Sequence, residues 1–380
     1  MQKKYTESYL KPYAIKSNNS KGRIYKENES YIRTPFQRDR DRIIHSSSFR
    51  RLKHKTQVFV NTEGDHYRTR LTHSMEVSQI ARTLARYLFL NEDLCETLSL
   101  SHDLGHTPFG HAGEDVLNEC MSSYGGFDHN LQTLRIITFL ENKYYKFKGL
   151  NLSIETLDGL IKHNGPIYNI IKLKTIMKNN IFLDKIIFGD SASLEAQVAS
   201  ISDDIAYNNH DLEDGLRAGL FSITQLKSVK LISQIISKHS KHTKNFRREI
   251  IVNQIVRELI NKMVLDVIKT TENNIKKIKP KTIKDIYKQK YLIVDFSDKM
   301  KSEIKEIKFF LKKNMYNHKR VIINTNRGKK IIKELFIHLL KNPKKYISKD
   351  IFIETTKERA ISDFIAGMTD RYAINLHIKI

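Results

Sequence analysis

Hydrophobic residues recur at helical spacing over most of the chain. Val77, Ile80 and Leu84 follow one another at intervals of three and four residues, which places them on one face of a helix starting near Thr72. His73 falls in register with these apolar positions. We therefore expect its imidazole to point toward the core with them.

The next segment repeats this pattern and then stops abruptly. Leu98 and His102 share one face of a second predicted helix, so this histidine also points inward. Gly105 and Pro108 end that helix. The spacing predicts a tight loop that runs on through His111.

Other segments complete a mainly helical prediction. Residues 39–59 begin as a helix and end in a β-leaning tail, residues 61–70 form a polar loop, and residues 126–141 form an amphipathic helix. A further helix covers 193–215, with Gly215 as its C-cap, and a closing helix covers 357–376. Between them, Ile, Leu, Val and Phe alternate with Lys at helical spacing, interrupted by short β-branched runs at 291–296 and 320–325. The pattern predicts an all-α, mainly helical fold.

The composition agrees with an all-α fold and also bears on the cellular compartment. Gly and Pro are scarce, at 15 and 6 of 380 residues, which favours long helices over a protein with many turns. Neither an apolar leader nor a run near the roughly 18 residues of a membrane span occurs, so we expect no membrane partner. Cys95 and Cys120 are too few for a disulfide framework. We expect a reduced, cytoplasmic protein.

Charge divides the chain unevenly. Residues 221–380 hold 37 Lys and Arg against 15 Asp and Glu, whereas residues 1–220 hold 29 against 27. We predict an N-terminal arm over 1–38, a catalytic core over 39–219 and a basic, mostly helical region over 220–380. The basic region could bind single-stranded nucleic acid. The simpler interpretation is an AT-rich genome, because Ile and Asn are also abundant there and no nucleic-acid-binding motif accompanies the charge.

The stretch HDLGHTPFGH at 102–111 concentrates residues that bind metals. Buried imidazoles and carboxylates are costly unless they are paired or metal-bound. His73, His102 and Asp103 supply three ligands, and a carboxylate in ISDDIAY supplies a fourth. Two histidines and two aspartates suit Mn²⁺, Mg²⁺, Fe²⁺, Co²⁺ or Zn²⁺ and leave positions for water and substrate.

Further polar residues surround these ligands. His106, His111 and His129 exceed what one metal needs, so we expect general acid or base roles for them. A group of basic residues precedes the first histidine: Arg50, Arg51, Lys53, Lys55 and Arg70. Although a single such residue would be assigned to a solvated helix face, the cluster favours a substrate with a phosphate chain.

These motifs together resemble the deoxyguanosine triphosphate triphosphohydrolase (dGTPase) family, its dGTPase-like branch in particular. His73, His102-Asp103 and Asp203 match the signature of HD-domain metal-dependent phosphohydrolases. The longer strings are RDRIIHSSSFRRLKHKTQVF, HYRTRLTHSMEVSQIAR, HDLGHTPFGHAGE, FDHNLQTLRI, EAQVASISDDIAYNNHDLEDG and FIAGMTDRYA. The resemblance covers about 33–215 and resumes at 357–376, whereas 220–355 carries no matching motif.

The resemblance implies an HD-domain core with an additional, mostly helical C-terminal region. It implies hydrolysis of a dNTP at the α-phosphorus, which releases deoxynucleoside and inorganic triphosphate, with Mn²⁺ or Mg²⁺ as the first candidates for the metal. The implied metal ligands are His73, His102, Asp103 and Asp203, and the implied acid or base groups are His106, His111 and His129. The implied substrate contacts are Gln57, Arg70, Tyr207, Asp211 and Arg371. Relatives imply a homo-oligomer.

Helical geometry supports Asp203 over its neighbour as the ligand. Asp203, Tyr207 and Asp211 lie four residues apart, on one face with smaller residues, whereas Asp204 is rotated by about 100°. A tyrosine against the deoxyribose leaves little room for a 2′-hydroxyl, which predicts a preference for dNTP over rNTP.

Two departures from the family pattern and two alternatives accompany this interpretation. Thr107 stands where many members have proline, and Asn130 follows His129 where some have glutamate, so the acidic partner of His129 is open. One alternative is an HD hydrolase of another substrate, such as a 5′-nucleotidase or a (p)ppGpp hydrolase. The other is a nucleic-acid-binding regulatory protein with a vestigial HD site, although none of the four ligands is missing.

Overall fold

The computed structural model describes residues 6–57, 67–168, 170–177, 181–239, 247–348 and 351–380. These residues form an all-α fold, as predicted, and within them no strand forms beyond isolated β-bridges such as Thr56 with Thr69. The first half contains α1 (Pro35–Ile44), α2 (Ser47–Arg51), α3 (Arg70–Leu88), α4 (Glu92–Ser101), α5 (Gly110–Cys120), α6 (His129–Arg135), α7 (Ile154–Ile161), α8 (Ile170–Met177) and α9 (Leu194–Arg217). The second half contains α10 (Ile223–Leu226), α11 (Lys230–Lys238), α12 (Arg248–Ile278), α13 (Ile283–Tyr287), α14 (Asp298–Leu311), α15 (Lys319–Lys341), α16 (Ile351–Glu354), α17 (Lys357–Ala366) and α18 (Asp370–Ile378).

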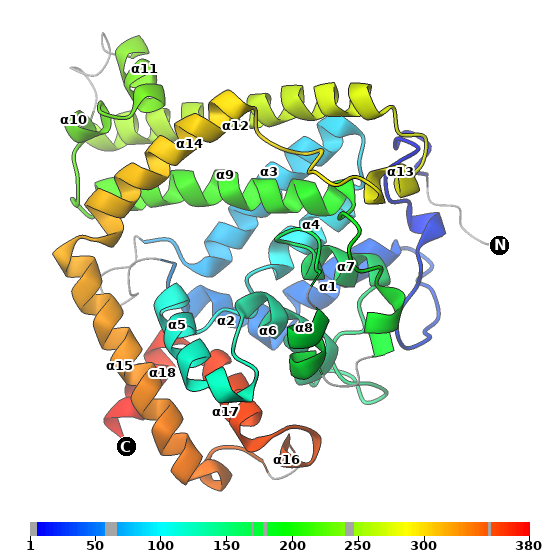
Figure 1. Ribbon diagram of the computed structural model, residues 1–380, viewed down its shortest axis with the longest axis vertical. Helices are drawn as coiled ribbons and strands as arrows, with labels where there is room; N and C mark the ends of the chain where they lie inside the picture. The colour runs from blue at the N-terminus through cyan, green and yellow to red at the C-terminus, as the bar shows by residue number, and fades with distance from the viewer. Residues whose placement is uncertain (1–5, 58–66, 169, 178–180, 240–246, 349–350) are drawn as a thin grey trace.

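Three helices of the first half position the predicted metal ligands. Helix α3 packs against both α4 and α9, and α9 crosses the middle of the molecule in Figure 1. Thr69 caps α3 by accepting a hydrogen bond from the Thr72 backbone N–H, which fixes where the helix begins. The apolar face that the spacing predicted on α3 is buried, with Val77 and Leu84 fully so. His73 shares that face and is 1% exposed.

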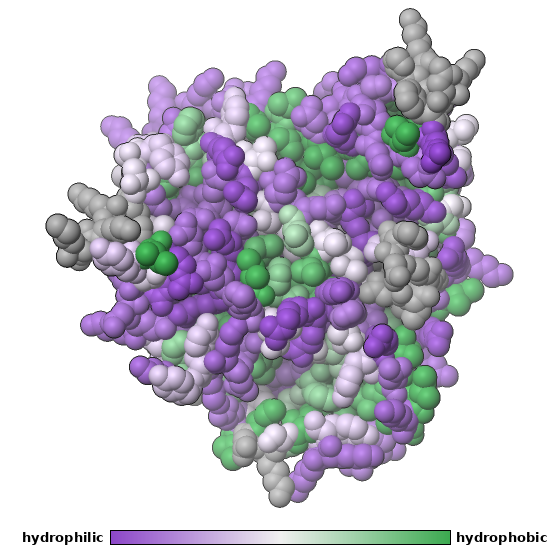
Figure 2. All heavy atoms as spheres, turned by 180° about the vertical axis from the view of Figure 1, so that it is seen from behind, coloured by the Kyte–Doolittle hydropathy of each residue, from purple (hydrophilic) through white to green (hydrophobic). Residues whose placement is uncertain are grey.

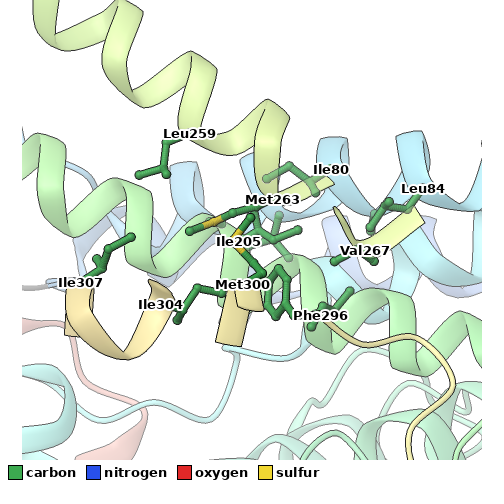
Figure 3. Close-up of a cluster of buried hydrophobic side chains, with 14 of the residues drawn as sticks. Ile80, Leu84, Ile205, Leu259, Met263, Val267, Phe296, Met300, Ile304 and Ile307 are labelled. Atoms are coloured by element: carbon green, nitrogen blue, oxygen red, sulfur yellow. The ribbon is translucent and has the colours of Figure 1, made fainter. Parts of the chain in front are cut away.

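The basic C-terminal region joins the same core. Helix α12 lies along α9 and α3 (Figure 1), and its apolar residues Leu259, Met263 and Val267 meet Ile205 of α9 (Figure 3). Met300 of α14 and further apolar residues from that helix enter the same cluster. Residues on both sides of position 220 are therefore buried together.

The two halves of the chain also pack together at the other end of the molecule. Helix α15, orange in Figure 1, packs against the cyan α5 and the red α17 and α18. Phe109 and Leu117 from the first half share a buried cluster there with Leu335 of α15 and Ile361 of α17. The HDLGHTPFGH stretch is held in place by this cluster through Phe109.

Several sequence-based boundaries were wrong. His111 lies in α5, which begins at Gly110, rather than in a loop. Gly215 is not a C-cap, because α9 continues to Arg217 and the Phe221 ring packs closely against this glycine. The predicted closing helix is two helices, since the chain turns after Ala366 and Thr369 caps α18.

The β-branched and β-leaning runs form no strand. Residues 320–325 lie inside α15, because Lys and Ile at helical spacing give that helix a buried face. In the run 291–296, the backbone N–H groups of Ile293 and Val294 donate to Gln197 Oε1 instead of to a sheet partner. The tail at 55–57 makes only the bridge from Thr56, and residues 58–66 lie outside the described part, as does most of the predicted polar loop.

The face of the molecule shown in Figure 2 is largely hydrophilic. On the face shown in Figure 2, apolar side chains appear as small patches between polar ones. Among the described residues, no helix combines the length and the apolar character needed to cross a bilayer.

Candidate active site

Three of the four predicted metal ligands converge at the centre of the fold. His73 of α3, His102 at the end of α4 and Asp203 of α9 each offer a ligand atom, and these atoms lie within 4.8 Å of one another. His73 Nε2 is 2.9 Å and His102 Nε2 is 3.5 Å from Asp203 Oδ1. Nitrogen and carboxylate donors at this separation fit a divalent metal ion.

The hydrogen bond at the back of His102 prepares its other nitrogen for a metal. Nδ1 donates to the Ser99 carbonyl at 2.7 Å, and Nε2 has no hydrogen-bond partner among the described residues. Burial lowers the pKa of His102, but the carboxylates of Asp103 and Asp203 outweigh it and raise the pKa to about 9. The carboxylates thus favour a positive charge at Nε2, which a metal ion would supply in place of a proton.

His73 is oriented by a chain of partners that the sequence did not reveal. Its Nδ1 lies 3.2 Å from His210 Nδ1, and His210 Nε2 lies 2.8 Å from Glu76 Oε2. Burial lowers the pKa of His210 to about 4, so this imidazole is neutral. Burial raises the pKa of Glu76, but hydrogen bonds from His210 and Arg68 outweigh it and hold it at about 2.

These charge states define the direction of each hydrogen bond. An ionised Glu76 accepts from His210 Nε2–H, so His210 Nδ1 carries the lone pair and accepts from His73 Nδ1–H. His73 Nε2, which faces Asp203, is then the nitrogen that would offer its lone pair to a metal ion. A metal-binding histidine needs this arrangement.

Asp103, the fourth predicted ligand, is shared between neighbours. Its Oδ2 accepts from Arg70 NH1 at 3.0 Å, while Oδ1 lies 3.4 Å from His102 Nε2 and 3.1 Å from His106 Nε2. Burial raises the pKa of Asp103, but the charges of His102 and Arg70 and the hydrogen bond from His106 outweigh it and hold it well below its usual value. One oxygen therefore faces the metal candidates and the other anchors Arg70.

Arg70 presents unused donors at the same place. It is 1% exposed, and its Nε and NH2 atoms have no partner among the described residues. Gly110, with φ of +58°, leaves room for it, since a Cβ there would lie 3.0 Å from NH2. The backbone carbonyl oxygen of Gln57 lies 3.6 Å from the same Cβ position. The buried side-chain Oε1 of Gln57 also lacks a hydrogen-bond partner among the described residues. Gln57 therefore lies on the same side of the candidate site as Arg70.

The three additional histidines form a second group. The rings of His106 and His129 stack at 4.0 Å, and His111 meets both edge-on at the start of α5. Burial and the nearby Arg70 charge hold the pKa of His106 well below its usual value.

The acidic partner of His129 is Glu114 of α5. Both carboxylate oxygens lie 2.9 Å from His129 Nδ1, and one also accepts from the His129 backbone N–H. The sequence contained this residue in HDLGHTPFGHAGE but gave it no role. At the other departure, Thr107 donates its hydroxyl to the Gly110 carbonyl at 2.9 Å.

Tyr207 and Asp211 lie together on α9, as their spacing predicted. A residue from the motif-free region completes the group: the Tyr316 hydroxyl is 2.9 Å from that of Tyr207 and hydrogen-bonds Asp211 Oδ2. Burial, with the Asp214 charge, raises the pKa of Asp211 to about 7 despite the tyrosine hydroxyls, which lower it. A buried carboxylate flanked by hydroxyl groups suits recognition of a sugar hydroxyl.

Three other residues lie near or outside this group. Arg371 is exposed on α18, and no described hydrogen bond or ion pair connects it with the histidine groups. His163, which the sequence did not single out, has its Nε2 3.7 Å from Asp203 Oδ2 and its ring 5.5 Å from that of His102. Asp204 points elsewhere, since its side chain is 49% exposed and pairs with Lys308 at 3.2 Å.

Comparison with known proteins finds two matching domains and several similar proteins. The HD domain matches residues 70–208, and the phosphohydrolase-associated domain matches residues 294–379. Three similar proteins come from Pelagibacter ubique (59% identity, 94% of this chain and 96% of the relative), Bartonella henselae (48%, 95% and 93%) and Brucella anthropi (47%, 97% and 94%). Each of these relatives is called a deoxyguanosinetriphosphate triphosphohydrolase-like protein.

Proposed function

Because the chain belongs to the family of deoxyguanosinetriphosphate triphosphohydrolase-like proteins, which are built on an HD domain, we propose that it is a metal-dependent dNTP triphosphohydrolase. The family assignment makes the chain a phosphohydrolase. The proposed reaction is dNTP plus water to deoxynucleoside and inorganic triphosphate. The bond that breaks joins the α-phosphorus to the 5′-oxygen.

One observation carries this proposal. Arg70, with its unused donors, bonds to Asp103 beside His102, and Tyr207 and Asp211 follow Asp203 at helical spacing on α9. An α-phosphate held at the metal position would have phosphate donors and a sugar-binding group within reach together. A hydrolase that makes no contact with the sugar of its substrate would not need the Tyr207–Asp211 pair.

His73, His102, Asp103 and Asp203 would hold the metal, with Mn²⁺ or Mg²⁺ as the first candidates and Fe²⁺, Co²⁺ or Zn²⁺ as others. A bound divalent cation polarises a phosphoryl oxygen and lowers the pKa of a bound water. The structure fits such an ion, since buried nitrogen and oxygen donors face one another and His102 Nε2 lacks a hydrogen-bond partner among the described residues.

The protein groups would then position the substrate and move its proton. Arg70 would donate to α-phosphate oxygens through Nε and NH2. The leaving 5′-oxygen must gain a proton, and we assign this role to His129 because both Glu114 carboxylate oxygens lie 2.9 Å from its Nδ1 and orient the ring. His106 and His111 would line the site next to His129, and His106 would be neutral beside Arg70.

Sugar recognition would fall to Tyr207, Asp211 and Tyr316, with Gln57 nearer the phosphates. An ionised Asp211 would accept a hydrogen bond from the 3′-hydroxyl. The Tyr207 ring would leave little room for a 2′-hydroxyl, so dNTP should be preferred to rNTP. Arg371, which is exposed, is proposed only as a residue at the edge of the site or at a subunit interface.

The test is to incubate the metal-loaded protein with each dNTP and with GTP, and to resolve the early products chromatographically. The proposal expects deoxynucleoside and triphosphate without orthophosphate, slower turnover of GTP, and no turnover with a chelator. Early release of dNMP and pyrophosphate, or of dNDP and phosphate, would contradict it.

A further inference from the structure

A turn near the C-terminus bonds to two segments of the candidate active site. Residues 366–370 connect α17 with α18, the two red helices of Figure 1, and lie within the match to the phosphohydrolase-associated domain. Asp370 is the first residue of α18 and is 2% exposed. Because a buried carboxylate is costly unless polar groups surround it, its partners indicate its role.

Both oxygens of Asp370 accept hydrogen bonds from backbone N–H groups. Oδ1 accepts from the Phe109 N–H at 3.0 Å. Oδ2 accepts from the Thr56 N–H at 3.0 Å and also from the Thr56 hydroxyl. One carboxylate therefore joins two segments from different parts of the chain.

Each of these segments carries residues of the candidate site. Phe109 adopts a left-handed backbone conformation directly before α5, whose second residue is His111. Thr56 directly precedes Gln57, and its β-bridge partner directly precedes Arg70. Asp370 thus connects the histidine group with the side of the site that carries the unused phosphate donors.

Lys55 makes a second connection between the C-terminal turn and the histidine group. Its Nζ donates to the His106 carbonyl at 2.5 Å and to the Ala366 carbonyl at 2.8 Å. The sequence placed this lysine in the basic cluster for a phosphate chain, but the residue is 2% exposed and these two partners are backbone oxygens. Its ammonium group therefore fixes the backbone beside the site.

We propose that Asp370 and Lys55 are positioning residues, which hold the histidine group and the Arg70 side of the site at a fixed separation. The inference rests on the proposed function, because a proton donor and a bound α-phosphate must keep a set distance for the reaction. Both residues act through backbone groups and need no contact with the substrate. The C-terminal turn thereby becomes part of what makes the histidine group work.

The substitution Asp370→Asn tests this role with little change in side-chain size. Its single amide oxygen can accept from the Thr56 N–H or from the Phe109 N–H, and its NH2 group then faces the other N–H as a second donor. One of the two segments loses its anchor, whereas Arg70 stays bonded to Asp103. We therefore expect kcat to fall more than KM changes.

The experiment measures kcat and KM for dGTP with Mn²⁺, per mole of folded, metal-loaded protein. The matched control is Asp39→Asn, since Asp39 is 0% exposed and accepts from the Ser153 N–H at 2.8 Å and the Ser153 hydroxyl at 2.6 Å. These bonds link α1 with the start of α7 and involve no residue of the candidate site. Lys55→Met, which keeps the stem but loses the ammonium donors, is the second test variant in case Asp370→Asn does not fold.

We expect each test variant to lower kcat about 10- to 100-fold, with KM changed less than about threefold and metal content unchanged. Asp39→Asn should lose stability but keep kcat within about twofold of the wild type, because its contacts are independent of the site. Wild-type kcat in the folded test variants, a change confined to KM, or an equal loss of kcat in Asp39→Asn overturns the inference.

Backbone hydrogen–deuterium exchange separates this inference from the proposed function, because it needs no substrate. Followed by mass spectrometry, the Thr56 and Phe109 segments should exchange faster in Asp370→Asn than in the wild type, whereas Asp39→Asn should leave their exchange unchanged. Unchanged exchange in Asp370→Asn overturns the inference whatever the protein hydrolyses. Wild-type products other than deoxynucleoside and triphosphate contradict the proposed function alone.

Discussion

The two histidines nearest Asp203 are each held in one tautomer by a different partner. Ser99 accepts from His102 Nδ1, and the neutral His210 accepts from His73 Nδ1. Both Nε2 atoms therefore face the carboxylate, where they would be the lone-pair donors to a bound metal ion. The same residues without these partners could turn either nitrogen inward, so the partners matter as much as the ligands.

His210 should thus control metal affinity without touching the metal. We expect His210→Ala to weaken Mn²⁺ binding about 10- to 100-fold, because His73 loses the acceptor that fixes its tautomer. His210→Gln should recover part of the affinity, since its amide can accept from His73 and donate to Glu76. Metal titration of the two folded variants checks this, and wild-type affinity in His210→Ala would refute it.

Adjacent aspartates on α9 should behave differently. Asp203→Ala should lose bound metal and activity together, because its carboxylate faces His73 and His102. Asp204→Ala should keep its metal, since its side chain is half exposed and pairs with Lys308. Elemental analysis of both purified variants decides the matter, and the reverse pattern would move the ligand to Asp204.

Asp211 should make substrate binding depend on pH. Its pKa is raised to about 7 by burial, so the carboxylate is protonated below that pH and ionised above it. An ionised group accepts the 3′-hydroxyl better, so KM for dGTP should rise about tenfold as pH falls from about 8 to about 6. The dideoxynucleotide ddGTP, which lacks this hydroxyl, should not show that change, and neither should Asp211→Asn with dGTP. A rise in KM of similar size with ddGTP would assign the effect to another group.

At the scale of elements, α9 is the part that the sequence described best. Its helical spacing placed Asp203, Tyr207 and Asp211 on one face, and the structure brings the last two together with a common partner. Local periodicity suffices there because all three residues lie on one helix. The predicted loop after His102 ends earlier than expected. Nothing in the local pattern shows that Phe109 adopts a left-handed backbone conformation and that α5 starts at Gly110.

Partners from distant elements were beyond a local pattern. Glu114, His163, His210 and Tyr316 reach the site through packing of α5, α7, α9 and the π-helical segment Lys312–Tyr316 after α14. Tyr316 comes from the region without a recognisable motif. The fold class was predictable from periodicity, whereas contacts between helices depend on how the whole chain packs.

Gly328 of α15 sets the distance between that helix and the HDLGHTPFGH stretch. A Cβ at Gly328 would lie 2.7 Å from Cγ of Phe109, so Gly328→Ala should push the two elements apart. We expect a loss of about 1–3 kcal/mol in the free energy of unfolding, together with reduced activity. Asn326→Ala, at an exposed position of the same helix, is the control. Denaturant unfolding checks this, and equal stability of Gly328→Ala and wild type would show that the contact relaxes freely.

At the scale of the whole molecule, the surplus of Lys and Arg over 221–380 is not confined to the outer surface. Three lysines of α14, Lys301, Lys305 and Lys308, line a cavity between α9 and α14. Single-stranded nucleic-acid binding, a homo-oligomer and a cytoplasmic location stay predictions, as do the boundaries of the three regions.

The central claim is attack by water at the α-phosphorus with release of intact triphosphate. Hydrolysis of dGTP in ¹⁸O-labelled water, followed by mass spectrometry of both products, tests it most directly. The account predicts one labelled oxygen in the triphosphate and none in the deoxyguanosine, because the P–O5′ bond breaks on the phosphorus side. Label in the deoxyguanosine, or in orthophosphate or pyrophosphate released as a first product, would contradict it.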